Sequence, residues 1–265
     1  MSQSLYTLNP EAIICHEPEL RELAERYGNI LSIPVVKQVS HNTAVLELNV
    51  DGLCLKQLGQ KQLGELRIDF ADGALTWRRL HGGGAGQAIA KAIGVKQKKA
   101  MRILDATAGT ATDSFVLASL GCHVTMIERH PVVALLLQDA LDRAQLIADV
   151  YDVTKNMDLI TGNAIEVMDG MPENSFDVVL LDPMFPHTGK TAQVKKSMQY
   201  FRDMVGKDED ADLLLEPASR LAKYRVVVKR PRKSPFLLNR KPTMSHEGKA
   251  NRFDIYVKTS IKAED

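Results

Sequence analysis

The sequence predicts an α/β fold in which a mostly parallel, doubly wound, Rossmann-like sheet follows a small α+β subdomain. Three observations support this. Apolar β-type runs alternate with helical patterns from residue 101 onward, as in sheets covered by helices on both faces. A turn of small residues follows the first of these runs, where such sheets bind ligands. Residues 1–80 have a different pattern, so we place a domain boundary between them and residues 81–265.

The amino-terminal region has the short runs and turns of a small mixed subdomain. A helix is expected at residues 18–27, and Gly28 is expected to end it. Asp72-Gly73 before residues 75–78 predicts a hairpin turn. The β-type runs are residues 30–36, 44–50 and 65–70.

A glycine-rich segment, residues 81–86, joins the two regions and precedes a helix predicted at residues 87–93. Its glycines permit close approach of the backbone to an anionic ligand or to a neighbouring element. A flexible joint explains them equally well.

The remaining elements follow in alternation. Strands are expected at residues 101–105, 123–128, 157–161, 176–182, 225–229 and 252–258. Helices are expected at residues 114–120, 131–147, 192–205 and 213–221.

Composition excludes several classes of protein. The net charge of the 265 residues is only +1, so no strong overall field attracts nucleic acid. The three cysteines lack the spacing of a zinc site or a disulfide framework, and we expect them to be reduced and buried, with no metal bound. Without a signal sequence or a long apolar run, we expect a soluble, cytoplasmic protein that has no membrane partner.

The turn after the first strand of the sheet is the first candidate site. It begins at Asp105, and small residues up to Gly109 let a ligand approach the backbone. The amides that open the following helix, around Thr112, favour a carboxylate. Asp113 suits a bound ammonium group or caps the helix.

Two further strand ends suit an adenosine. Glu128 lies 19 residues beyond Gly109, and a carboxylate in this place accepts hydrogen bonds from ribose hydroxyls. A solvated charge at a strand end is the alternative. Asn163 and Ala164 follow the next strand and could contact the base, although Gly-Asn is also an ordinary turn.

The segment from Asp182 to His187 follows a buried strand and suggests the reaction. Asp182 and the carbonyl of Pro183 can orient a planar amine towards a methyl donor. Phe185 can stack on the base that carries the amine. His187 is a candidate polar contact or proton acceptor, or a residue that hydrogen-bonds only within its loop.

These motifs resemble the RsmJ family, the bacterial 16S ribosomal RNA (guanine(1516)-N2)-methyltransferases. The similarity extends from about Phe70 to Tyr256 through many blocks. It includes Asp105-Ala106-Thr107-Ala108-Gly109, Glu128-Arg129-His130-Pro131, Leu181-Asp182-Pro183-Met184-Phe185-Pro186-His187 and Val226-Val227-Val228-Lys229-Arg230-Pro231. The chain departs from the family at Ala111 and Thr112, where glycine and arginine are usual.

The resemblance implies a methyltransferase fold, S-adenosylmethionine as the cofactor, and guanosine 1516 of 16S ribosomal RNA, free or in the small subunit, as the substrate. By this resemblance the cofactor site would include Thr112, Asp113, Glu128, Arg129, Asn163, Ala164 and Asp182.

Basic residues suggest where RNA would bind. Neutralising phosphates with such side chains makes binding weaken with salt, although a solvated surface is the alternative. The candidates are Lys195, Lys196, Lys229, Arg230 and Arg232. Two other functions stay open: a non-catalytic RNA-binding or ribosome assembly factor, and a nicotinamide-dependent dehydrogenase, which shares the turn and the acidic strand end.

Overall fold

The computed structural model describes residues 9–39, 43–59, 64–96, 100–184, 210–248 and 250–261. Contacts between Cα atoms group them into two units. The first comprises the described residues up to Asp69 together with Pro131–Arg143, and the second comprises the rest. The domain boundary placed after residue 80 stays a prediction.

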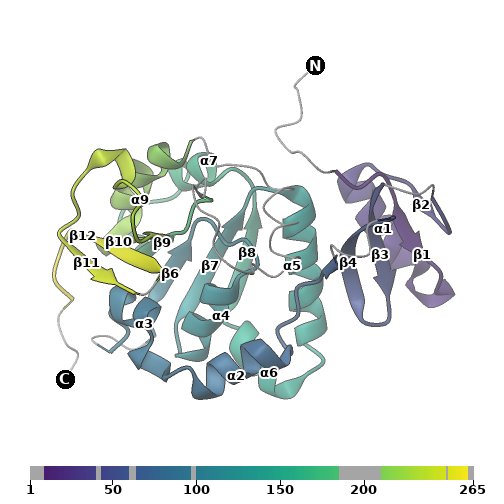
Figure 1. The fold of residues 1–265 in the computed structure, drawn as a ribbon, viewed down its shortest axis with the longest axis horizontal. Coiled ribbons are helices and arrows are strands. Elements are labelled where there is room, and N and C mark those ends of the chain that lie inside the picture. The colour runs from purple at the N-terminus through teal and green to yellow at the C-terminus, as the bar shows by residue number, and fades with distance from the viewer. Residues whose placement is uncertain are drawn as a thin grey trace. The chain divides into compact units, whose positions relative to one another are not determined.

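The second unit is built on a seven-stranded sheet with the order β11-β12-β10-β9-β6-β7-β8 (Figure 1). Strands β10, β9, β6, β7 and β8 run parallel to one another, whereas β12 is antiparallel to both β10 and β11. The α/β fold class is therefore confirmed. The strands are β6 (Arg102–Asp105), β7 (His123–Glu128), β8 (Met157–Thr161), β9 (Phe176–Leu181), β10 (Ala222–Pro231), β11 (Met244–Glu247) and β12 (Asn251–Val257).

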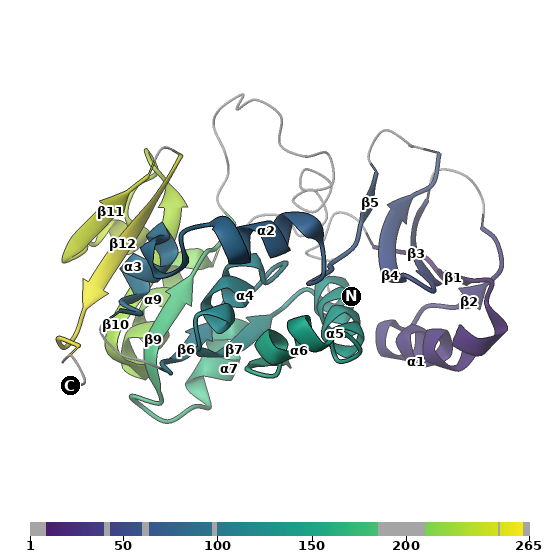
Figure 2. The same cartoon turned by 90° about the horizontal axis from the view of Figure 1, so that it is seen from below.

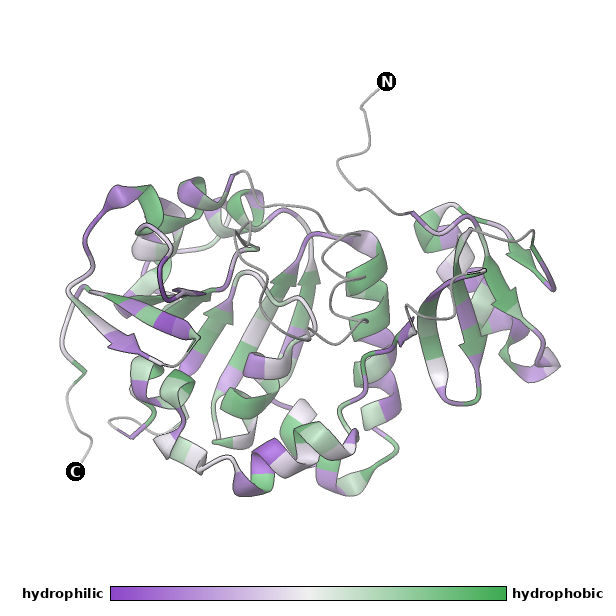
Figure 3. Cartoon of the chain, in the orientation of Figure 1, coloured by the Kyte–Doolittle hydropathy of each residue, from purple (hydrophilic) through white to green (hydrophobic). Residues whose placement is uncertain are grey.

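Helices cover this sheet, and hydrophobic residues are concentrated in its strands (Figure 3). One core cluster joins α7 and α9 to alternate residues of β9 and β10, such as Val179, Leu181, Val226 and Val228. In Figure 2, α2 runs alongside α4. The helices of this unit are α2 (Gly73–His81), α3 (Ala88–Ile93), α4 (Thr112–Ser119), α6 (Ala148–Thr154), α7 (Ala164–Asp169) and α9 (Leu215–Leu221).

The order of winding reverses between β6 and β9, which are neighbours although β7 and β8 lie between them in the sequence. In open α/β sheets, ligands bind beyond the carboxyl ends of the strands at such a point. The residues that follow β6 and β9 therefore occupy the expected binding position.

The first unit is built on a five-stranded sheet with the order β2-β1-β3-β4-β5. Strands β3 and β4 form an antiparallel hairpin, and β1 lies parallel to β2 and β3. Its elements are β1 (Ile13–Cys15), α1 (Arg21–Leu31), β2 (Val35–Val36), β3 (Ala44–Asn49), β4 (Gly52–Gln57) and β5 (Glu65–Leu66), together with α5 (Pro131–Ala144) up to Arg143.

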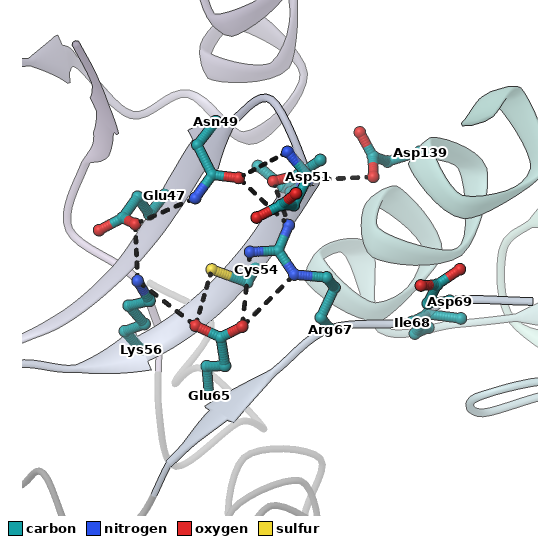
Figure 4. Close-up of polar contacts among 12 residues, drawn as sticks. Glu47, Asn49, Asp51, Cys54, Lys56, Glu65, Arg67, Ile68, Asp69 and Asp139 are labelled. Carbon is teal, nitrogen blue, oxygen red and sulfur yellow. Dashed lines mark hydrogen bonds and ion pairs between the residues drawn. The ribbon is translucent and has the colours of Figure 1, made fainter. Parts of the chain in front are cut away.

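Charged side chains of β3, β4 and β5 pair with one another (Figure 4). Lys56 Nζ lies 2.6 Å from a carboxylate oxygen of Glu47 and 3.4 Å from one of Glu65. Arg67 donates to the Gly52 carbonyl at 2.6 Å and to Glu65 at 3.4 Å. These cations therefore have partners within their own sheet.

The predicted hairpin at Asp72-Gly73 is wrong, because residues 73–81 form helix α2. The alternation of apolar and polar residues spans only four positions, which is too short to separate a strand from a helix. In the helix, Trp77 and His81 are one turn apart, and their rings stack at 5.6 Å.

The helix predicted at residues 18–27 does not end at Gly28. It begins as a 3-10 turn, Pro18–Leu20, and continues as α1 to Leu31, so β2 is shorter than the predicted strand at residues 30–36. Gly28 is required for close packing, since a Cβ atom there would lie 2.8 Å from the carbonyl oxygen of Ile33.

Most other predicted elements of the second unit are confirmed within one to three residues at their ends. Strands β1, β4 and β11 were not predicted, and the helix expected at residues 192–205 lies outside the described residues. The three cysteines are buried and free, as predicted. Among the described helices, none is long and apolar enough to cross a membrane.

Candidate functional site

The turn after β6 is tied to the neighbouring strand ends by its backbone. The amide of Ala106 donates to the Leu180 carbonyl at 3.0 Å, and that of Ala108 donates to the Ile127 carbonyl at 3.0 Å. Gly109 and Ala111 both have φ 54°, in the left-handed region. Ala111 precedes α4, and its positive φ strains an alanine at a position where glycine would fit freely.

Glu128, at the end of β7, faces this turn. One carboxylate oxygen accepts the amide hydrogen of Gly109 at 2.8 Å, and the other accepts that of His130 at 2.7 Å. The side chain is almost fully buried. A carboxylate fixed in this way can accept further hydrogen bonds from the hydroxyl groups of a ligand in the turn.

Asp105 is buried below the turn. Ser114 donates its hydroxyl to one oxygen at 2.5 Å, and the amide of Thr107 donates to the other at 3.2 Å. Burial raises the pKa of Asp105 to about 6, against the lowering effect of these two hydrogen bonds. Its contacts orient the turn.

Asp182 follows β9 and reaches the same turn. Its amide donates to the hydroxyl oxygen of Thr107 at 2.6 Å, so the end of β9 is bonded to the residues that follow β6. The Asp182 side chain is 41% exposed, whereas Pro183 is buried. The carboxylate is therefore within reach of a ligand at the switch point.

A row of alternating charges extends from Asp182. Lys229 Nζ lies 2.7 Å from Asp182 Oδ2 and 2.8 Å from Asp113 Oδ2. A guanidinium nitrogen of Arg78 lies 2.8 Å from the other oxygen of Asp113. Burial would raise the pKa of Asp113, but the cations of Lys229 and Arg78 outweigh it and hold this pKa below its ordinary value.

The remaining cofactor candidates lie at the start of α4 or follow strands β7 and β8. Thr112 is the first residue of α4, and its hydroxyl lies 3.1 Å from that of Thr110. Arg129 binds both oxygens of Asp210, at 2.9 and 3.0 Å. Asn163 caps α7, since its side-chain oxygen accepts the amide hydrogen of Ile165 at 2.9 Å, and Ala164 is the first residue of that helix.

The basic candidates differ in exposure. Arg230 is buried, whereas Arg232 is exposed and lies 3.1 Å from Glu247. Lys229 is directed at the two carboxylates described above. Phe185, His187, Lys195 and Lys196 lie outside the described residues.

Sequence reasoning missed Arg78, Thr107 and Ser114 as parts of this cluster. Thr107 and Ser114 lie in the motif blocks but carry no charge that would single them out. Arg78 was assigned to a strand of the hairpin that the structure does not contain. Only a helix predicted at residues 73–81 would have placed its side chain near Asp113.

Comparisons with known proteins identify the family of the chain. A family of SAM-dependent methyltransferases matches residues 31–258. A ribosomal RNA small subunit methyltransferase J of Pseudomonas fluorescens is 48% identical over 93% of this chain and 94% of its own length. One of Colwellia psychrerythraea is 53% identical over 82% of this chain and 79% of its own length.

The chain belongs to the ribosomal RNA small subunit methyltransferase J family. It is therefore an S-adenosylmethionine-dependent methyltransferase. A crystal structure of a SAM-dependent methyltransferase from Neisseria gonorrhoeae has the same fold, with a TM-score of 0.70 and 35% identity over 93% of this chain and 95% of that one. Membership of this family leaves the dehydrogenase alternative without support.

Proposed function

We propose that this methyltransferase modifies the exocyclic 2-amino group of a guanosine, guanosine 1516, in the 16S ribosomal RNA of the small subunit. The observation that carries the proposal is the 2.6 Å bond from the Asp182 amide to Thr107, which joins the strand end expected to hold the amine to the turn expected to hold the cofactor. The names of the relatives, small subunit methyltransferases, support ribosomal RNA as the substrate class.

The residues around the turn fit S-adenosylmethionine. Small side chains leave room beside the turn, and the buried Glu128 carboxylate suits the ribose hydroxyls. Acidic side chains near α4 suit the ammonium group of the cofactor, and the amides at the start of α4 suit its carboxylate. We assign the cofactor site to Asp105, Gly109, Thr112, Asp113, Glu128, Arg129, Asn163, Ala164 and Asp182.

The acceptor side of the site is assigned to Asp182 and Pro183, with Phe185 stacking on the base. The lone pair of a guanine amine is delocalised into the ring, so the amine is a poor nucleophile. A carboxylate and a carbonyl in the plane of the base would hold both N–H bonds and direct the nitrogen at the reacting carbon. When bound, the cofactor would supply an electrophilic methyl group, with S-adenosylhomocysteine as the leaving group as the carbon–sulfur bond breaks and the carbon–nitrogen bond forms. The methylated amine would then lose one proton to solvent.

RNA would be held by basic residues. Arg232 is the exposed candidate among the described residues, at the end of β10. We assign Lys195, Lys196 and His187 to the same role from the sequence. Arginine and lysine side chains there would neutralise phosphates and make binding depend on salt.

The test is mass spectrometry of 16S ribosomal RNA from cells with the gene, without it, and with the gene restored. We expect one N2-methylguanosine, at position 1516, to vanish and return. If every methyl mark persists without the gene, the proposal is wrong. Cofactor binding with no RNA methylation in any assay would instead support the assembly factor.

A further inference from the structure

Lys229 lies between Asp113, which the proposed function assigns to the cofactor, and Asp182, which it assigns to both the cofactor and the substrate amine. The pairing of β10 with β9 places it there, because Val228 is in register with Leu181 and the next residues along are Lys229 and Asp182. Asp113 comes from the first turn of α4. Three elements therefore converge on one ammonium group, 2.7 and 2.8 Å from the two acids.

The charged side chains of this cluster form a row with no net charge. Arg78, Asp113, Lys229 and Asp182 alternate in sign, with each neighbouring pair 2.7 to 2.8 Å apart. Burial lowers the pKa of Lys229, but the carboxylates of Asp182 and Asp113 outweigh it and hold this pKa above its ordinary value. The ammonium is therefore charged at any pH at which the enzyme would work.

Lys229 is placed differently from a lysine that binds a phosphate group. The side chain of Lys229 is 23% exposed, and its ammonium binds two carboxylates at distances typical of strong charge-assisted hydrogen bonds. Two of its three N–H bonds are directed at acids, so a phosphate could accept only the third and would lie against two carboxylates. Exposed Arg232, three residues further along, is paired with Glu247 at the surface and with neither of these two acids.

We propose that Lys229 is a positioning residue of the methyl transfer: it holds the Asp182 carboxylate ionised and oriented towards the substrate amine, and it couples Asp182 to Asp113 at the cofactor turn. This inference rests on the proposed function of Asp182. Without Lys229, Asp182 would lose the cation that separates it from Asp113, and it would still be repelled by the Asp105 carboxylate. Repulsion would then favour its protonation or its rotation out of the plane of the base.

The experiment compares Lys229→Met and Lys229→Arg with a matched control, Lys223→Met, which removes one exposed lysine at the start of the same strand. Methyl transfer to small-subunit RNA is measured over pH, and binding of S-adenosylhomocysteine is measured by calorimetry. Only variants that unfold at a temperature near that of the wild type are compared.

We expect Lys229→Met to lower kcat by about 10- to 100-fold, because the carboxylate is misplaced, while KM for RNA stays within about twofold. The acidic limb of its pH profile should move to higher pH, since Asp182 is then easier to protonate. Its affinity for S-adenosylhomocysteine should fall by about 3- to 10-fold because Asp113 loses a partner. Lys229→Arg should restore part of kcat, and Lys223→Met should match the wild type.

A rise in KM for RNA at unchanged kcat would make Lys229 a phosphate ligand and overturn the proposal. A lower kcat with the wild-type pH profile and no recovery in Lys229→Arg would mean that Lys229 forms only a structural ion pair. That result would also overturn the proposal. If the wild type methylates no ribosomal RNA, the proposed function fails, and calorimetry alone then decides whether Lys229 supports Asp113.

Discussion

Asp139 in the first unit and Asp182 in the second are both held by residues distant in sequence, but their surroundings differ. Asp139, on α5, accepts hydrogen bonds from the Leu53 amide at 3.0 Å, the Tyr27 hydroxyl at 3.3 Å and Arg143 at 2.8 Å, and it is buried. Figure 4 shows Asp139 directed at the turn between β3 and β4. Asp182 is partly exposed at a strand end.

The surroundings of each carboxylate therefore decide what it does. Asp139 lies inside its unit and accepts hydrogen bonds from buried donors, so it stabilises the folded state. Asp182 lies at the reversal of strand order and keeps an exposed side chain beside a charged lysine. We therefore expect stability effects from the first and chemical effects from the second.

The largest expected effect on stability is that of Asp139→Ala. The change leaves Arg143 and two other donors without their buried acceptor, which should lower the free energy of unfolding by about 3 kcal/mol. Chemical denaturation measures this. Asp142→Ala on the same helix, where the side chain is exposed, should change it by less than about 0.5 kcal/mol. Equal losses in both variants would remove the special role of Asp139.

Glu128→Ala extends the comparison between Asp139 and Asp182 to a buried carboxylate of the second unit. Loss of the acceptor for the ligand hydroxyls, and of the bond to the Gly109 amide, should weaken binding of S-adenosylhomocysteine by about 100-fold. Calorimetry measures the affinity, with Glu166→Ala, an exposed acid on α7, as the control. Wild-type affinity in Glu128→Ala would place the adenosine elsewhere.

His130→Gln tests a buried group in the second unit, just before α5 begins. Burial, assisted by Arg129, lowers the pKa of His130 to about 4 from 6.5. Below pH 6.5 the unfolded chain therefore takes up a proton that the folded protein does not, and stability is lost as the pH falls towards 4. From pH 7 to pH 5 the stability of the wild type relative to His130→Gln should fall by about 2 kcal/mol.

Urea unfolding at several pH values measures this difference. Asp105, whose pKa is raised to about 6, acts in the opposite direction, but it is present in both proteins and cancels in the comparison. A difference that is constant between pH 7 and pH 5 would mean that His130 titrates normally.

Ala111→Gly has the smallest expected effect. Glycine adopts φ 54° without the strain that alanine bears, so the variant should gain about 0.5 to 1 kcal/mol of stability. Thermal unfolding measures the gain, and Ala118→Gly inside α4 should lose stability instead. A loss in Ala111→Gly would show that the turn does not strain alanine.

Much of the second unit could be predicted from the sequence because most of its strands contain a short apolar run followed by a turn. Strand β11, whose four residues are all exposed, has no such run and was not predicted. The run before Asp182 is the clearest case, since all six residues of β9 are buried. The first unit was harder. Strand β1 has three residues and β5 has two, and such segments are defined by their partners in the sheet rather than by their own pattern.

The candidate site was predictable where residues follow strands and unpredictable where side chains meet across elements. Glu128 faces Gly109 as its spacing suggests. The sequence contains nothing that directs Lys229 towards Asp113, 116 residues earlier, because that contact depends on how α4 lies beside β10. The acidic residues of the site could therefore be predicted from the sequence, whereas the cations that pair with them could not.

The most direct test of the account measures methyl transfer from S-adenosylmethionine to small-subunit RNA that lacks the mark, using Asp182→Ala, the wild type and the exposed-strand control Asp158→Ala. Nucleoside mass spectrometry identifies the product. We predict N2-methylguanosine with the wild type and the control, and a rate lower by at least about 1000-fold with Asp182→Ala, which should keep its affinity for S-adenosylhomocysteine within about tenfold. Near-normal turnover by Asp182→Ala would contradict the account.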